Sequence, residues 1–425
     1  MNYKKIEIGS YNLHMIKTNK FKTTNLEIVF SNKIKKEEIT LTNFLSASLF
    51  TTSKKYNTKM LQSRKLEDLY AARFSTNCYR IGNLFNVDFN MKILNDKYVE
   101  ENLLEKALDF LHEVLFNPNV KDNRFDEDTF NIVYNEQKAQ IDRLKEDTKR
   151  YSLQRMLELT DEDAPYSYNL KGNCEDLNKI TRGNLYSFYK KMIKCTHIDI
   201  FVIGDIDFES VKNIIANKFD FKVKREDNIS PLVPLKKIRN KIQEVSEDDA
   251  TNQAKLSMSL LIEDMTKFER DYVVNIYNSI LGGTADSLLF KNVREKFSLC
   301  YYITSGAYKV DNLLTIVSGF TKDNYKQVLF LIDKELNNII EGKFDDESID
   351  NAKNYYISSL EAIEDSPTQI IASFYAMDLL GVDSIEKRKE NIKKVTKEDI
   401  INLAKKVHKD TIFLLGGNKK WLEKV

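Results

Sequence analysis

The spacing of hydrophobic and polar residues divides the chain into short strands and longer helices. Apolar or alternating runs are typical of strands, and apolar residues that recur every three to four positions are typical of amphipathic helices. The predicted strands cover residues 5–16, 25–30, 84–91, 198–203, 254–261, 300–308 and 313–319. The predicted helices cover residues 39–50, 61–72, 100–116, 125–145, 182–194, 268–281, 285–297, 322–341, 346–363 and 395–408. This interleaving predicts an α+β fold in which each half of the chain has a mostly antiparallel sheet covered by helices on one face.

Two blocks of sequence repeat in the same order along the chain. Residues 125–150 (FDEDTFNIVYNEQKAQIDRLKEDTKR) and 344–367 (FDDESIDNAKNYYISSLEAIEDSP) both open on Phe-Asp, and both reach Glu-Asp-Thr or Glu-Asp-Ser near their ends. Residues 180–192 resemble residues 395–407, and a strand-like run that ends in Gly follows each. A threonine at the second position of each of these two segments is predicted to cap its helix. Similar blocks at nearly the same offset indicate two copies of one domain.

The predicted boundary between the two copies is a charged segment that contains two of the five prolines, Pro231 and Pro234. Proline and charge clusters between periodic segments are typical of linkers. We therefore predict an N-terminal domain over residues 1–224, a linker over 225–246 and a C-terminal domain over 247–425.

Composition and charge limit the function classes. The 425 residues include 65 Lys and Arg against 64 Asp and Glu, a formal net charge of +1 that argues against a generally basic, nucleic-acid-binding surface. The four cysteines, Cys78, Cys174, Cys195 and Cys300, form no C-x-x-C pair and are too sparse for a disulfide framework. No signal-peptide pattern begins the sequence, and no apolar run approaches the roughly 18 residues of a membrane helix. We expect a cytoplasmic protein that binds neither nucleic acid nor membrane.

Several catalytic motifs are absent from the sequence. It contains no H-E-x-x-H or H-x-x-E-H zinc helix, no G-x-x-x-x-G-K-[ST] phosphate loop and no G-x-S-x-G elbow. Within residues 285–302, Leu289, Val293 and Phe297 share one helical face and are predicted to be core residues. Arg294 projects from a neighbouring face, where spacing alone favours a solvated charge run over Arg294-Glu295-Lys296.

Blocks along nearly the whole chain carry a family resemblance. Residues 282–301 read GGTADSLLFKNVREKFSLCY, and this segment resembles the second-domain signature of the pitrilysin/insulinase family of zinc metallopeptidases. VIGDID at 202–207 is similar to the strand-turn that ends its first domain, and IGSYNLHMI at 8–16 is similar to its opening strand. The closing segment 395–407 also fits. The resemblance implies two homologous peptidase-like domains.

The sequence departs from the family at the metal site. Active members carry H-x-x-E-H on an early helix and a further glutamate on a later helix. In the segment TLTNFLSASLF (40–50), Asn43, Ser46 and Ala47 stand at the His, Glu and His positions, and Glu136 is the candidate for the later glutamate. Asn is a poor zinc ligand, Ala is none, and Ser cannot replace a carboxylate general base. We therefore expect no metal, no cofactor and no catalytic residue on this chain.

The substrate-holding residues of the family have counterparts. The resemblance implies that Arg294 and Tyr301 contact the peptide backbone. It also implies a bacterial protein that pairs as a heterodimer with a zinc-containing paralogous subunit, or as a homodimer, and acts on peptides or unfolded proteins. Two alternatives stay open. In the first alternative, the chain is a stand-alone peptide-binding or scaffold protein without proteolysis. In the second, it is a self-sufficient zinc peptidase with unorthodox ligands.

Overall fold

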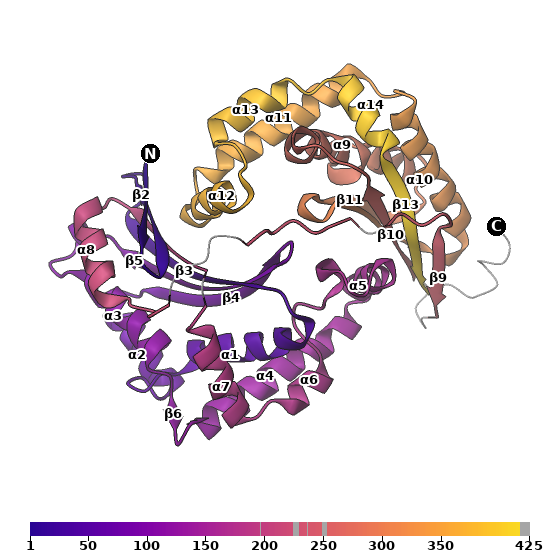
Figure 1. Cartoon of the computed structure of the whole chain (residues 1–425). Coiled ribbons are helices and arrows are strands. Elements are labelled where there is room, and N and C mark those ends of the chain that lie inside the picture. The colour runs from indigo at the N-terminus through magenta and orange to yellow at the C-terminus, as the bar shows by residue number, and fades with distance from the viewer. Residues whose placement is uncertain (196, 224–228, 236, 249–252, 417–425) are drawn as a thin grey trace. The chain divides into compact units, whose positions relative to one another are not determined.

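The computed structural model describes every residue except 196, 224–228, 236, 249–252 and 417–425 (Figure 1). The chain forms two compact units. Unit 1 consists of residues 1–142, 169–231 and 367–372, and unit 2 consists of residues 143–168, 232–366 and 373–425. The main passage between the units falls inside the predicted linker, of which residues 225–228 and 236 lie outside the described residues. The units differ from the predicted domains in that residues 143–168 belong to unit 2 and residues 367–372 belong to unit 1.

Unit 1 is built on a six-stranded sheet. Its strand order is β1 (Asn2–Ile8), β2 (Tyr11–Lys17), β8 (Ile198–Gly204), β3 (Thr23–Lys33), β5 (Leu84–Leu94) and β4 (Arg73–Ile81). Every neighbouring pair is antiparallel except β2 and β8, which run parallel. The single strand predicted at 5–16 is a hairpin, because Gly9 adopts a left-handed φ of +51° between β1 and β2.

Helices cover one face of this sheet (Figure 1). They are α1 (Ile39–Thr51), α2 (Lys59–Asp68), α3 (Leu103–Phe116), α4 (Glu127–Glu146), α6 (Cys174–Lys179), α7 (Arg182–Met192) and α8 (Phe208–Lys218). Alternate residues of β3, namely Leu26, Ile28 and Phe30, are buried in the core between the sheet and the helices. No helix in the described part of the chain combines the length and apolar composition that a membrane span requires.

The sheet of unit 2 repeats the topology of unit 1. Its strand order is β11 (Cys300–Tyr308), β12 (Leu313–Thr321), β10 (Gln253–Ile262), β13 (Val407–Leu415) and β9 (Gln243–Glu247). This order matches β4, β5, β3, β8 and β2, and the parallel pair β13 and β9 matches β8 and β2. The shared order and the shared position of the parallel pair confirm the predicted α+β fold of two homologous domains.

The main helical layer of unit 2 also covers one face of its sheet (Figure 1). It comprises α9 (Val274–Asn278), α10 (Tyr325–Ile340), α11 (Asp346–Ile363), α12 (Pro367–Leu380), α13 (Ile385–Lys393) and α14 (Lys397–Lys405). The first six residues of α12 belong to unit 1. π-Helical turns lie at Glu269–Val273, Ser279–Gly283 and Phe290–Lys296. The predicted caps of the repeat are confirmed, because Thr181 before α7 and Thr396 before α14 each close a capping box.

The second face of this sheet is partly covered by α5 (Thr148–Thr160). Met156 and Leu157 of α5 pack in one apolar cluster with Phe413 of β13 and Leu261 of β10. The prediction of helices on only one face is therefore wrong for unit 2. The second face of its sheet also carries apolar residues, and α5 buries them.

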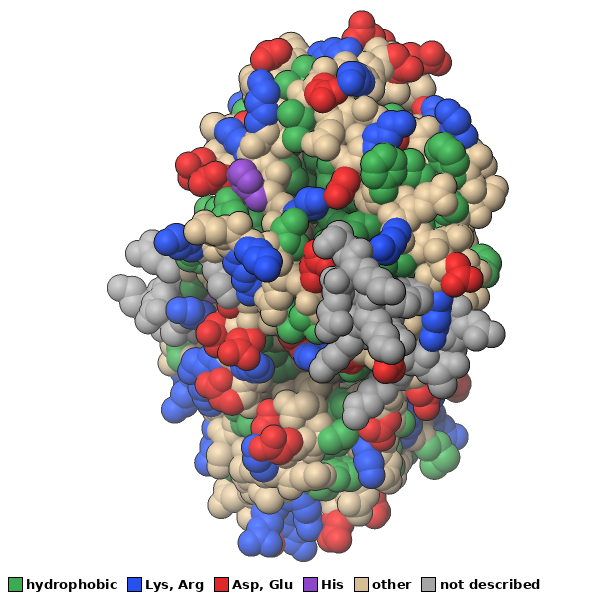
Figure 2. All heavy atoms as spheres, turned by 90° about the vertical axis from the view of Figure 1, so that its right-hand side faces the viewer, with side chains coloured by type: hydrophobic (Ala, Val, Ile, Leu, Met, Phe, Trp, Pro, Cys, Tyr) green, Lys and Arg blue, Asp and Glu red, His purple; other side chains and the backbone are tan. Residues whose placement is uncertain are grey.

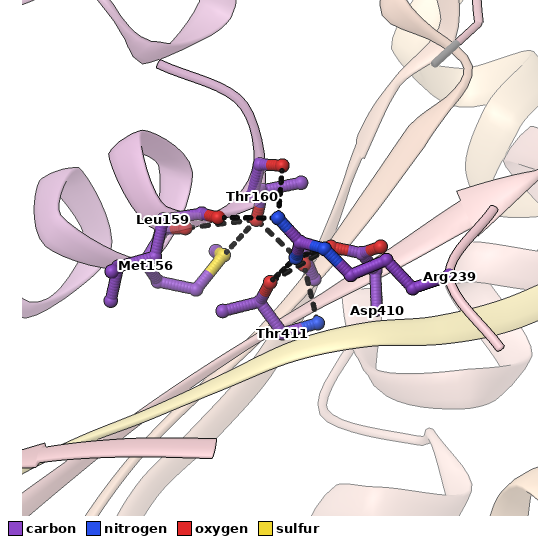
Figure 3. Close-up of polar contacts among 7 residues, drawn as sticks. Met156, Leu159, Thr160, Arg239, Asp410 and Thr411 are labelled. Atoms are coloured by element: carbon purple, nitrogen blue, oxygen red, sulfur yellow. Dashed lines mark hydrogen bonds and ion pairs between the residues drawn. The ribbon is translucent and has the colours of Figure 1, made fainter. Parts of the chain in front are cut away.

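A segment that follows Leu232 is fixed to unit 2 through Arg239. Figure 3 shows its guanidinium reaching the end of α5 and the strand β13. Arg239 Nη2 donates to the carbonyl oxygens of Leu159 at 2.9 Å and Thr160 at 3.1 Å. Arg239 Nη1 donates to Asp410 Oδ1 at 2.6 Å and Thr411 Oγ1 at 2.8 Å. One side chain thus caps a helix and neutralises a buried carboxylate.

The charged side chains of the protein are mixed in sign. Acidic and basic groups are interspersed over the face shown in Figure 2, and the hydrophobic side chains on it occur in small separate groups. This distribution agrees with the formal net charge of +1. A protein with this surface has no extended basic stripe on that face for binding a phosphate backbone.

Candidate functional site

The four degenerate motif positions line one cavity of unit 1. Asn43, Ser46 and Ala47 lie on α1, and Glu136 lies on α4. The cavity has a volume of about 300 Å³. Its other lining residues are Phe50, Thr76, Asn77, Cys78, Val133, Gln137, Gln140 and Lys171. The structure therefore brings together all four residues that the family resemblance aligns with metal-site positions.

Asn43 is used as a structural tie. Its Nδ2 donates to the carbonyl oxygen of Ile39 and to that of Leu170, each at 2.9 Å. The first bond lies within α1, and the second joins α1 to the loop before α6. Both amide hydrogens are thus engaged by backbone oxygens.

Gln137 makes a similar tie from the facing helix. Its Nε2 donates to the carbonyl oxygen of Thr40 at 3.0 Å, which joins α4 to the start of α1. The Thr40 hydroxyl in turn accepts from the backbone N–H of Asn173 at 3.2 Å. Gly172 comes so close to Thr40 that a Cβ there would lie 2.3 Å from the hydroxyl oxygen. The walls of the cavity are therefore held by direct hydrogen bonds and close packing.

The remaining donors of the cavity do not suit zinc. Burial raises the pKa of the Cys78 thiol to about 12, although a hydrogen bond with Ser46 acts in the opposite direction, so this sulfur is a neutral thiol. Glu136 is half exposed and lies 3.5 Å from Lys59 Nζ. Ala47 offers no ligand atom. One exposed carboxylate and a neutral thiol fall short of the three His, Cys or carboxylate ligands of a catalytic zinc site.

Buried carboxyl groups lie on the sheet behind this cavity. Asn77 donates from its backbone N–H and its Nδ2 to Asp88 Oδ1, each at 3.0 Å. Burial nevertheless raises the pKa of Asp88 to about 6. Burial, followed by the charge of Asp88, raises the pKa of Glu27 on β3 to about 8. Glu27 therefore holds its proton at neutral pH, whereas Asp88 loses its proton below neutral pH.

Arg294 and Tyr301 belong to unit 2. Arg294 is exposed in the π-helical turns that precede β11, and its guanidinium carbon lies 4.6 Å from the centroid of the Phe290 ring. It has no ion-pair partner among the described residues. Tyr301 is the extra residue of a β-bulge, since Cys300 pairs with Phe320 while Tyr302 pairs with Gly319. Its side chain is 54% exposed. π-Helical turns and bulges often present functional side chains.

Several cavity residues were missed from the sequence. Gln137 directly follows Glu136 in YNEQ, and Cys78 was noted only as an isolated cysteine. Asn77, Gln140 and Lys171 carried no sequence signal, because they belong to a polar edge strand, an exposed helical face and a loop. Their common property is the cavity, which only the fold defines.

Comparison with known proteins gives consistent results. The family described as "Peptidase M16 inactive domain" matches residues 179–356. A Bacillus subtilis protein named "Probable inactive metalloprotease YmfF" is 28% identical over 425 residues, which cover 99% of each chain. A solved structure of a conserved protein from Enterococcus faecalis superposes with a TM-score of 0.92 at 28% identity over 98% of this chain and 99% of that one. A Pseudomonas fluorescens structure titled as a peptidase M16 inactive domain has the same fold, with a TM-score of 0.79 at 16% identity over 98% of this chain and 99% of that one.

A duplicated α+β fold with this cavity defines a metallopeptidase homologue whose metal-binding positions carry no suitable ligands. The strand order within each sheet, the cavity and the sequence matches all agree with that class. The chain is similar to the M16 peptidases, the pitrilysin/insulinase family, over residues 179–356, which match the inactive-domain model, and over its full length to a probable inactive metalloprotease. Its sequence lacks the H-x-x-E-H motif.

Proposed function

We propose that this chain is the non-catalytic subunit of a bacterial cytoplasmic peptidase. In this proposal it forms a heterodimer with a zinc-bearing paralogue, encloses a peptide or unfolded segment and completes the partner's active site. The observation that carries the proposal is the state of the cavity. Asn43 is committed to two backbone oxygens, and yet the cavity of about 300 Å³ persists. The cavity therefore leaves room for part of a bound peptide.

The role of this chain in hydrolysis would be to position the substrate. The Arg294 guanidinium is exposed and unpaired within the described residues, so its forked donors are available to a peptide carbonyl. The Tyr301 hydroxyl, on an exposed bulge, is available to a developing oxyanion. The bond would be cleaved at the metal of the partner, which supplies the activated water.

The proposal is tested by a peptide-cleavage assay of this chain and an H-x-x-E-H paralogue from the same organism, alone and mixed. We expect cleavage only, or at least tenfold faster, in the mixture. Arg294→Ala and Tyr301→Phe should lower the rate of the mixture by about 10²-fold, the effect of losing one stabilising donor. Lys296→Ala, on the same π-helical turns, is the matched control. Equal rates for the paralogue with and without this chain would refute the proposal.

A stand-alone peptide-binding protein is the second candidate. The observation in its favour is the lining of the cavity, where Gln140 and Lys171 offer an amide and an ammonium group that bind a peptide main chain without cleaving it. This function predicts binding of an extended peptide by the isolated chain, and loss of that binding in Gln140→Ala. Binding that appears only in the presence of the paralogue would favour the heterodimer instead.

A self-sufficient zinc peptidase is the third candidate, and metal analysis tests it. We expect less than about 0.1 zinc per chain in the purified protein, because the donor set falls short of three ligands. The triple variant Asn43→His, Ser46→Glu and Ala47→His restores two ligands beside Glu136 and should bind about one zinc per chain. Stoichiometric zinc in the unaltered protein would overturn the non-catalytic assignment.

A further inference from the structure

Unit 1 contains a second cavity, which the proposed function does not use. It has a volume of about 220 Å³ and lies where the end of β3, the start of β5, the turn before α1 and the end of α7 meet. Its lining residues are Asn32, Lys33, Lys35, Glu38, Thr42, Phe85, Val87, Phe188, Lys191 and Met192. None of these residues lines the cavity of the degenerate metal site.

The floor of this cavity is apolar. Phe85, Val87 and Met192 are all more than nine-tenths buried, and the half-buried Phe188 ring adds an aromatic wall. Such a floor gains little from an inorganic anion, which has no apolar surface to bury. It suits a flat ring or a branched hydrocarbon that removes this surface from water.

The rim of the cavity is basic. Lys191 Nζ lies 2.6 Å from Glu38 Oε1, and Lys35 Nζ lies 3.4 Å from the same oxygen. Lys191 Nζ also lies 5.6 Å from the centroid of the Phe188 ring. The Lys33 ammonium, at the end of β3, has no ion-pair or hydrogen-bond partner in the part of the chain that the structure describes. Three lysines against one glutamate leave the rim with an excess of positive charge.

These two features define the chemistry of the ligand. We propose that the cavity binds a small organic acid with one carboxylate and an aromatic body. The carboxylate would accept hydrogen bonds from Lys33 and Lys191, and the ring would lie on Phe85 beside Phe188. Glu38 holds Lys191 in place and, by its own charge, disfavours polyanions. The volume corresponds to about seven water molecules at roughly 30 Å³ each, which accommodates a bicyclic ring with a short acidic chain.

Isothermal titration calorimetry with three probes tests the proposal on the full chain. Indole-3-acetate has both the ring and the carboxylate, tryptophol has the same ring without the charge, and acetate has the charge without the ring. We expect indole-3-acetate to bind at least tenfold more tightly than either of the others, and more weakly as salt is raised, because the lysines are exposed. Equal binding of indole-3-acetate and tryptophol, or no binding of either, would overturn the proposal.

Charge-changing variants locate the site. Lys33→Gln and Lys191→Gln should each weaken indole-3-acetate binding by about five- to tenfold, since each removes a charge-assisted hydrogen bond. Glu38→Gln should strengthen it, because the built-in competing carboxylate is lost. Lys190→Gln is the matched control, since Lys190 neighbours Lys191 on α7 but lies over the Tyr186 ring, outside the cavity. Weakening by Glu38→Gln, or equal weakening by Lys190→Gln, would refute the assignment.

A competition experiment identifies the source of the ligand. A tripeptide that ends in tryptophan presents the same ring and carboxylate as a peptide terminus. Displacement of indole-3-acetate by this tripeptide would show that both bind through the ring and the carboxylate. It would then identify the C-terminal residue of a peptide as the ligand. Lack of displacement supports a free acid as the ligand. The outcome does not depend on any partner subunit, so its failure is distinguishable from failure of the proposed peptidase role.

Discussion

Replacement of Arg239 by alanine should destabilise unit 2 substantially. Arg239 donates four hydrogen bonds, and its partner Asp410 has a side chain with no exposed surface (Figure 3). Removing one member of a buried ion pair leaves the other charge uncompensated and costs about 3–5 kcal/mol. Because the Arg239 side chain is 27% exposed, we expect the lower end of this range, about 3 kcal/mol. The two carbonyl oxygens at the end of α5 lose their donor as well.

Urea unfolding monitored by circular dichroism measures this cost for Arg239→Ala, for Asp410→Asn and for the double variant. The double variant should be about 1–2 kcal/mol more stable than Arg239→Ala alone, because it removes the buried unpaired charge. Lys179→Ala breaks an exposed ion pair on α6 and serves as the control without a measurable change. A loss below about 1 kcal/mol for Arg239→Ala, or strictly additive effects, would refute the assignment of this contact as a stabilising clamp.

Two further predictions concern buried and terminal polar groups. The pKa of Glu27 is raised from 4.5 to about 8, so the folded protein keeps a proton that the unfolded chain releases, and stability should fall as the pH rises from about 4.5 to 8. Glu27→Gln should remove most of this fall in urea titrations at pH 5 and pH 8, where at about 1.4 kcal/mol per pH unit it amounts to at most about 4 kcal/mol. An unchanged pH dependence would contradict the prediction. Thr181→Ala and Thr396→Ala should each cost about 1 kcal/mol in the same assay, because each removes an N-cap, whereas Ser substitutions should cost much less.

The strands and helices that were predicted correctly have strong periodic patterns. The apolar run at 198–203 and the alternating run at 254–261 form the central strands β8 and β10. The edge strands β4 and β9 were missed, because they are polar and only partly buried, so their sequences show little alternation. The helix α5 was missed for another reason. Its apolar residues pack on β10 and β13, about 100 or more residues further along the chain.

The positions of the degenerate site were predictable only through the family resemblance. Spacing alone shows that Asn43, Ser46 and Ala47 lie on neighbouring faces of a helix, and nothing in it indicates a metal site. The hydrogen bond from Asn43 to Leu170 spans 127 residues and depends on the folded position of the loop before α6. Long-range contacts of this kind cannot be derived from local patterns. They explain, however, why an asparagine suits the position.

The hydrogen bonds around the cavity make one last prediction, that stability is independent of metal. In a zinc protein, the ion itself links the helices that carry its ligands, and its removal weakens the fold. Here three hydrogen bonds link α1, α4 and the loop before α6, each worth about 1 kcal/mol. The bond from Asn43 to Leu170 and the bond from the Asn173 N–H to Thr40 join α1 to the loop before α6. The bond from Gln137 to the Thr40 carbonyl joins α4 to α1. The urea midpoint should therefore be the same with EDTA and with added zinc. A midpoint that falls on chelation would show that an ion supports the cavity walls, and the interpretation of Asn43 as a replacement for a metal link would then be wrong.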